Sequence, residues 1–148
     1  MLDYDGGAQS GSSSNPMLLI DPTFTGGATK DSNNLAMWAS NNPSLSFNYK
    51  IQWTHTVTVK GASGDVIVGA SVTATDAQGH QECSGVTNSS GTLSCTLTDT
   101  TYGAASGKYT VTSSNPFSVR ISATGCSTAN NSRTILSTTS ETVALPGC

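Results

Sequence analysis

Apolar and polar residues alternate through the middle of the chain. Odd-numbered positions from Leu45 to Val59 are apolar or aromatic except His55, and the positions between them are polar. A period of two is typical of a β-strand with one buried face. We therefore predict a long strand over residues 44–61.

Shorter segments of the same kind follow, separated by turns rich in Gly, Asn, Ser and Asp. The predicted strands are Ala70–Thr75, Gln81–Val86, Thr92–Leu97, Lys108–Ser113, Phe117–Ala123 and Thr142–Leu145. About seven short strands at close spacing indicate an all-β domain of two packed antiparallel sheets over residues 44–148. The predicted core comprises Val72, Ala74, Leu93, Leu97, Tyr109, Val111, Val119, Ile121 and Val143.

Residues 1–43 form an extended N-terminal segment with a different pattern. Gly6–Asn15 is rich in Gly and Ser, which predicts a tether. Two X-Pro pairs then bracket an apolar run that suits a buried strand. This run consists of Met17, Leu18, Leu19 and Ile20. Between Asp31 and Ser40 we expect one short helical turn.

Composition narrows the possible partners. Only 10% of the residues are charged, against about 25% in ordinary domains, and the net charge is -3. The six Lys and Arg residues form no basic cluster, so nucleic acid is not expected as a partner. No stretch approaches the roughly 18 apolar residues that cross a bilayer, so membrane insertion is not expected either.

The chain contains four cysteines without the paired CxxC spacing of zinc ribbons. They are Cys83, Cys95, Cys126 and Cys148. A disulfide framework is the better interpretation, and buried free thiols are the alternative. Because disulfides persist in oxidising compartments, we expect an extracellular or cell-surface location. The first five residues lack the start of a secretory signal, so a fragment or a processed form is expected.

The pairing of the cysteines depends on one turn. If residues 87–91 turn through a three-residue loop, Cys83 lies opposite Cys95 at a Cα separation of about 4.5 to 5.5 Å, which suits a disulfide. A two-residue or four-residue loop would not place them so. Cys126 then pairs with Cys148, closing a loop of about 20 residues and stabilising the fold by about 3 kcal/mol.

Four short motifs in order resemble the carboxypeptidase regulatory-like family, over about residues 54–148. They are Val57-Thr58-Val59-Lys60, Gly69-Ala70-Ser71-Val72, Thr87 with Gly91-Thr92-Leu93, and Gly107-Lys108-Tyr109-Thr110-Val111. The resemblance implies an immunoglobulin-like or prealbumin-like sandwich that serves as a non-catalytic module of exported proteins. The cysteines and the stretch Asp99–Ser106 depart from the family pattern.

Candidate catalytic residues are sparse. His55 on the alternating strand and His80 in a turn are the only histidines, and neither accompanies a nucleophile motif. The acids Asp65, Asp76, Asp99 and Glu141 are single and scattered, unlike a glycosidase pair or a calcium loop. We therefore expect no enzyme activity, no cofactor and no metal.

Two sequons fall in predicted turns. Asn88-Ser89-Ser90 and Asn130-Asn131-Ser132 match the N-glycosylation pattern, so Asn88 and Asn130 are possible acceptors.

Two functional hypotheses remain open at this point. The first is a structural or assembly module of an exported surface protein, such as a filament or appendage subunit, in which residues 17–20 add a strand to a neighbouring copy. The same run can instead fold back on its own domain. The second is a carbohydrate-binding or spacer module of a secreted polysaccharide-active enzyme, with Trp38 and Tyr102 in loops as a platform for a surface glycan.

Overall fold

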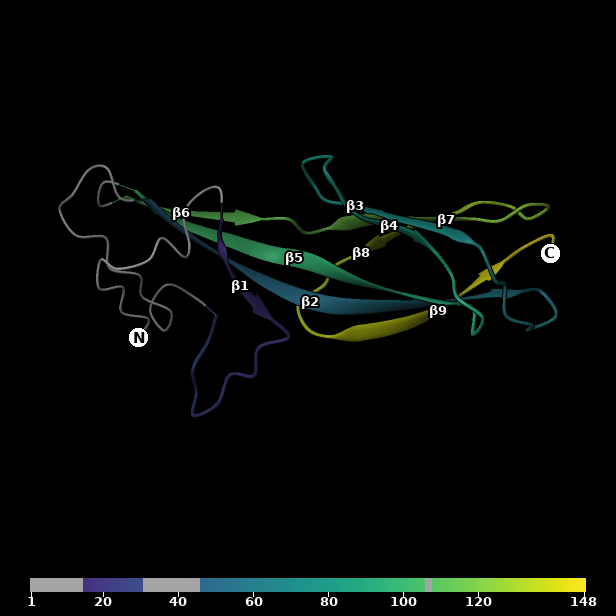
Figure 1. Cartoon of the computed structure of the whole chain (residues 1–148), viewed down its shortest axis with the longest axis horizontal. Coiled ribbons are helices and arrows are strands. Elements are labelled where there is room, and N and C mark those ends of the chain that lie inside the picture. Colours follow the sequence, from purple (N-terminus) through teal and green to yellow (C-terminus); the bar gives the residue numbers. More distant parts are fainter. Residues whose placement is uncertain (1–14, 31–45, 106–107) are drawn as a thin grey trace. The chain divides into compact units, whose positions relative to one another are not determined.

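The computed structural model describes residues 15–30, 46–105 and 108–148, which contain nine β-strands and no helix (Figure 1). The strands are β1 (Met17–Ile20), β2 (Ser46–Gly61), β3 (Ser71–Thr75), β4 (Gln81–Val86), β5 (Thr92–Ala105), β6 (Lys108–Ser113), β7 (Phe117–Ser122), β8 (Ala129–Arg133) and β9 (Thr139–Leu145). The predicted all-β fold is confirmed. The helical turn expected between Asp31 and Ser40, and the domain boundary expected between residues 43 and 44, lie outside the described residues.

The strands form two sheets. One has the order β1-β2-β5-β6, with β9 also paired to β2, and the other has the order β4-β3-β7-β8. Several pairings are antiparallel, as predicted, but β1 and β9 each run parallel to β2. The chain divides into two compact units, Met1–Gln52 with Thr98–Ser113 and Trp53–Leu97 with Ser114–Cys148. The long strands β2 and β5 contribute to both units, which are described separately.

The unit of Trp53–Leu97 and Ser114–Cys148 is a β-sandwich. One layer contains the second half of β2, the start of β5, and β9, and the other layer is the four-stranded sheet. Every second residue of β7 is buried, because successive side chains of a strand point to opposite faces. The buried apolar residues of this unit include Val57, Val59, Ala70, Val72, Ala74, Leu97, Phe117, Val119, Ile121, Ile135, Val143 and Leu145.

The unit of Met1–Gln52 and Thr98–Ser113 contains β1, the first half of β2, the second half of β5, and β6. The rings of Tyr49 and Tyr102 stack at a centroid distance of 4.6 Å. A Cβ on Gly103 would lie 2.7 Å from the Thr110 hydroxyl and 2.8 Å from the Asn48 side-chain oxygen. A larger residue here would require these two side chains to shift.

The buried positions of β5 change phase along the strand. They are odd-numbered up to Leu97 and even-numbered from Thr100, and residues 97–100 are all buried. Asp99 lies at this change of phase and is buried.

Several predicted strands differ from those in the structure. The strand predicted over Thr92–Leu97 continues to Ala105, into the stretch that departs from the pattern of the family that the chain resembles. The strand β8 was not predicted, because Ala129–Arg133 has the polar composition of a turn. Its pairing with β7 supplies hydrogen bonds that local propensity does not reveal.

The predicted core is correct at most positions. Val72, Ala74, Leu97, Val119, Ile121 and Val143 are buried. Leu93 is half-buried. The prediction is wrong for Tyr109 and Val111, which are 59% and 60% exposed. Both belong to β6, whose residues are all exposed, so the alternation of this strand does not correspond to a buried face.

Candidate functional site

The predicted assembly strand is a strand in the structure. Residues 17–20 form β1 and pair in parallel with β2, with Met17 opposite Tyr49 and Ile20 opposite Gln52. The Asp21 amide extends the pairing by donating to the Gln52 carbonyl at 2.9 Å. The run therefore folds back on its own chain in this structure.

Burial of β1 is partial. Leu18 and Ile20 are 49% and 52% exposed, whereas Met17 and Leu19 are half-buried. The parallel register places Leu18 and Ile20 on the same face as Lys50 and Gln52, their partners in β2. Two of the four side chains of this strand therefore remain largely in solvent.

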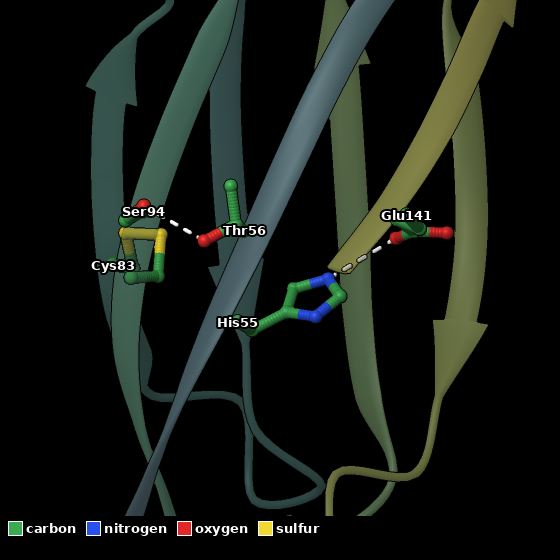
Figure 2. Close-up of a disulfide and its surroundings, with 6 residues drawn as sticks. His55, Thr56, Cys83, Ser94 and Glu141 are labelled. Atoms are coloured by element: carbon green, nitrogen blue, oxygen red, sulfur yellow. Dashed lines mark hydrogen bonds and ion pairs between the residues drawn. A yellow bond between two sulfur atoms is a disulfide. The ribbon is translucent and has the colours of Figure 1, made fainter. Parts of the chain in front are cut away.

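A polar cluster lies inside the sandwich unit around His55. The ring Nδ1 lies 2.8 Å from the Thr139 hydroxyl, and Nε2 lies 3.1 Å from Glu141 Oε1. Figure 2 shows the imidazole pointing from β2 toward Glu141 of β9. The parallel register explains this contact, because His55 is paired with Thr139 and Val57 with Glu141.

The second oxygen of Glu141 binds Arg133 of β8. Its Oε2 accepts from Arg133 Nε at 2.7 Å and lies 2.5 Å from Nη2. Since β8 and β9 belong to different sheets, this ion pair joins the two layers of the sandwich. The side chains of His55, Glu141 and Arg133 are 3%, 16% and 36% exposed, so the cluster runs from the interior to the surface.

Hydroxyl, imidazole and carboxylate follow one another in this cluster, the order used by activated nucleophiles. Both Glu141 oxygens are engaged, and the His55 ring is buried. These contacts connect β2, β9 and β8. Sequence reasoning missed it because His55 and Glu141 are 86 positions apart and form no motif.

A second buried ion pair lies in the unit that contains β6. Lys30 Nζ contacts Asp99 Oδ2, and the Asp99 side chain is 2% exposed. The Thr100 hydroxyl donates to the other Asp99 oxygen at 3.2 Å. A buried carboxylate needs such partners, because desolvation of an unpaired charge is costly.

The Asp76 carboxylate organises the turn between β3 and β4. Its Oδ1 accepts from the backbone amides of Gln78 at 2.9 Å and His80 at 2.7 Å, and Oδ2 lies 3.1 Å from the His80 ring. Burial by itself raises the pKa of Asp76, but the hydrogen bonds from His80 and Gln78 and the His80 charge outweigh it and hold the pKa below its ordinary value. The His80 side chain is 77% exposed, so it is solvated as expected.

Both expected disulfides are present. Cys83 is joined to Cys95 at a Cα separation of 5.9 Å, and Cys126 to Cys148 at 4.9 Å. The geometric reason given for the first pairing is wrong. β4 and β5 lie in different sheets and are not neighbours in a ladder, so this disulfide links the two layers of the sandwich. Figure 2 also shows the Thr56 and Ser94 hydroxyls, which lie 2.8 Å apart and join β2 to β5.

The remaining candidate residues are dispersed. Trp38 lies outside the described residues. The loop position expected for Tyr102 is wrong, because this residue is in β5, 8% exposed, with its ring stacked on Tyr49. Asn88 lies in an exposed turn, as expected, but the turn expected around Asn130 is wrong, because Asn130 is in β8.

No protein-family model matches the chain, and no curated protein matches it. The resemblance to the carboxypeptidase regulatory-like family therefore stays a prediction. Over residues 15–30, 46–105 and 108–148, no group of three His, Cys, Asp or Glu side chains could hold a metal ion. No helix in these ranges has the length and hydropathy needed to cross a membrane.

Proposed function

We propose that this chain is a non-catalytic structural module of an exported, glycosylated surface protein, and that copies assemble into a filament or appendage by exchanging β1. The observation that carries the proposal is the parallel pairing of β1 with β2. A short N-terminal strand pairs there with the edge of a long one, and residues 21–45 connect the two. The two disulfides fit the oxidising environment of such a protein.

Exchange of β1 conserves its contacts. The four register pairs with Tyr49–Gln52, and the bond from Asp21 to Gln52, form equally well whether β1 comes from the same copy or from a neighbour. Domain swapping of an identical element is a low-cost route to assembly for this reason. If each copy donates β1 forward and receives one from behind, the contact is heterologous and generates an open filament.

The polar groups of the sandwich unit support a structural role. Glu141 contacts His55 through one oxygen and Arg133 through the other. These three residues connect β9 to β2 and to β8, across the two layers. The Asp76 carboxylate accepts hydrogen bonds from the backbone amides of its own turn. A module whose buried charges hold the fold together resists unfolding and proteolysis, which suits an exposed subunit.

Mixed single-cysteine variants test the exchange. Leu18 and Lys50 are opposite each other in the β1–β2 register, so cysteines at these positions are close enough to oxidise. Leu18→Cys and Lys50→Cys are purified separately, mixed, and oxidised under assembly conditions. Exchange gives covalent dimers that contain one of each variant on non-reducing gels.

A matched control comes from β5 and β6. Thr101 and Thr112 are also register partners, but these strands belong to one hairpin, with Ala105 opposite Lys108, and do not exchange. Thr101→Cys mixed with Thr112→Cys should give no specific dimer. If Leu18→Cys cross-links to Lys50→Cys only when both are in one chain, the exchange is wrong.

Deletion of residues 1–22 tests assembly directly. Electron microscopy and light scattering of the full chain should show filaments or ordered arrays, and the truncated chain should lack them. Unchanged assembly without β1 would contradict this mode of association, and a strictly monomeric full chain would contradict the filament.

A further inference from the structure

The turn between β4 and β5 presents a sequon to solvent. Asn88, Ser89 and Ser90 are all exposed. The Gly91 amide donates to the Asn88 carbonyl at 2.9 Å, closing a β-turn, and the Asn88 amide donates to the Thr92 carbonyl at 2.9 Å. The acceptor asparagine is therefore at the first position of an ordered, protruding turn.

Hydrogen bonds orient the Asn88 side chain. Its Oδ1 accepts from the Ser90 amide at 2.9 Å, the Thr92 amide at 3.1 Å and the Thr92 hydroxyl at 2.9 Å. The side-chain amide carries Oδ1 and Nδ2 on the same planar carbon. The three hydrogen bonds of the turn are accepted by Oδ1, so Nδ2, the atom that would be glycosylated, takes no part in them.

The second sequon lies in a different environment. Asn130 pairs with Arg120, and Ser132 with Ser118, in the ladder between β8 and β7. A transferase that binds Asn-X-Ser as an extended loop would have to detach β8 from its sheet. Asn130 and Ser132 are exposed as well, but the Asn88 turn lies outside any sheet ladder, so only its own turn hydrogen bonds would have to open.

We propose that Asn88 is the N-glycosylation site of the folded protein and that Asn130 is not. In the reaction, Asn88 Nδ2 forms a bond to the anomeric carbon of a lipid-diphosphate-linked oligosaccharide. The bond from that carbon to the diphosphate oxygen breaks, the lipid diphosphate leaves with the electron pair, and Nδ2 loses one proton to solvent. This assignment rests on the export in the proposed function, since the transferases of this class act in the secretory pathway.

The test uses the purified, disulfide-bonded protein. It is incubated with a single-subunit oligosaccharyltransferase that recognises Asn-X-Ser/Thr and with a lipid-linked oligosaccharide, and the intact mass is measured. The expected result is the added mass of one glycan on the wild-type chain and on Asn130→Gln, and none on Asn88→Gln. Ser90→Ala should also lose the glycan, although it keeps the backbone amide that binds Asn88.

Two results would overturn the assignment. One is an unmodified wild-type chain in a reaction that modifies a free sequon peptide, and the other is a glycan retained by Asn88→Gln. Circular dichroism of each variant checks that it is folded. Assembly of the unmodified protein is scored separately, so failure of this site removes the glycosylation from the proposed function and leaves the assembly by exchange of β1 standing.

Discussion

At the scale of single residues, buried charge is neutralised by partners from distant parts of the chain. Glu141 is bound by His55 and Arg133, and Asp99 by Lys30. Desolvation of a lone carboxylate in these positions would be costly. Each pair therefore requires its own strand register, and a change in one partner leaves a buried charge unmatched.

The Asp76 turn makes stability dependent on pH. The pKa of Asp76 is held below its ordinary value of 3.8 in the folded protein, so the ionised carboxylate favours folding. This contribution is fully present above about pH 4 and is lost as the pH falls through the folded-state pKa. Asp76→Ala should lower the free energy of unfolding by about 1 to 2 kcal/mol at pH 7.

Urea denaturation at several pH values measures this effect. The difference between wild type and Asp76→Ala should shrink below about pH 4, where the wild-type carboxylate becomes protonated. Asp65→Ala is the control, because its carboxylate accepts from the exposed Ser63 hydroxyl. A wild-type advantage that stays constant down to pH 2 would contradict the assigned cause.

Gly91 combines a left-handed backbone with close packing. Its φ is +69°, and a Cβ would lie 2.7 Å from Val66 Cβ and 3.1 Å from the Val59 carbonyl oxygen. Gly64 has a φ of +91°, but nothing lies within 4 Å of the position that its Cβ would occupy. Substitution of Gly64 therefore measures the free-energy cost of the left-handed backbone without a steric clash. Gly64→Ala should cost about 1 kcal/mol and Gly91→Ala about 3 kcal/mol. Equal losses in thermal unfolding would mean that the neighbours of Gly91 adjust freely.

At the scale of elements, strands from different sheets are joined by side chains. The Arg133–Glu141 pair joins β8 to β9, and the Cys83–Cys95 disulfide joins β4 to β5. No main-chain ladder connects these strand pairs. Side-chain links of this kind hold the edges of a sandwich, where backbone pairing stops.

A double-mutant cycle measures the link between β8 and β9. Glu141→Gln keeps the shape of the side chain but removes its charge, and Arg133→Gln removes the partner charge. The coupling energy should be about 1 to 2 kcal/mol, above that of an exposed pair, because Glu141 is largely buried. Additive losses in urea unfolding would show that the two residues act independently.

The two disulfides should differ in their contribution to stability. Their sequence separations are 12 and 22, so loop entropy alone favours the Cys126–Cys148 bridge. Cys95 is 4% exposed in the core, whereas Cys148 is an exposed terminal residue. Replacing Cys83 and Cys95 by Ala should therefore cost about 4 kcal/mol, and replacing Cys126 and Cys148 about 3 kcal/mol. The reverse order in thermal unfolding would show that loop entropy dominates.

At the scale of the whole molecule, exchange of β1 predicts open assembly. A heterologous contact adds copies without a fixed end, whereas reciprocal exchange between two copies gives a closed dimer. Sedimentation velocity at increasing protein concentration should show a growing series of species for the full chain. A single dimer that persists at every concentration would contradict head-to-tail assembly, although it would retain the exchange.

The hydrophobic pattern alone predicts the strand class and much of the core. Period-two alternation in β2 identified its buried face from Tyr49 to Val59, because this strand lies with one side against the interior along its length. The even number of cysteines and the compartment argument correctly favoured disulfides, and the pairing is correct although the antiparallel register used to derive it is wrong. The same alternation failed in β6, since Tyr109 and Val111 alternate with polar residues in a strand that nothing in the described residues covers.

Pairings between distant segments were decided only by the tertiary structure. The parallel pairing of β9 with β2 brings Glu141 to His55, and the placement of β4 and β5 in different sheets makes the first disulfide an inter-layer link. Local sequence determines which segments favour a strand, because β-propensity and the alternation of apolar and polar residues are local properties of the chain. It does not determine which strands meet, because that choice depends on the packing energy of the complete core.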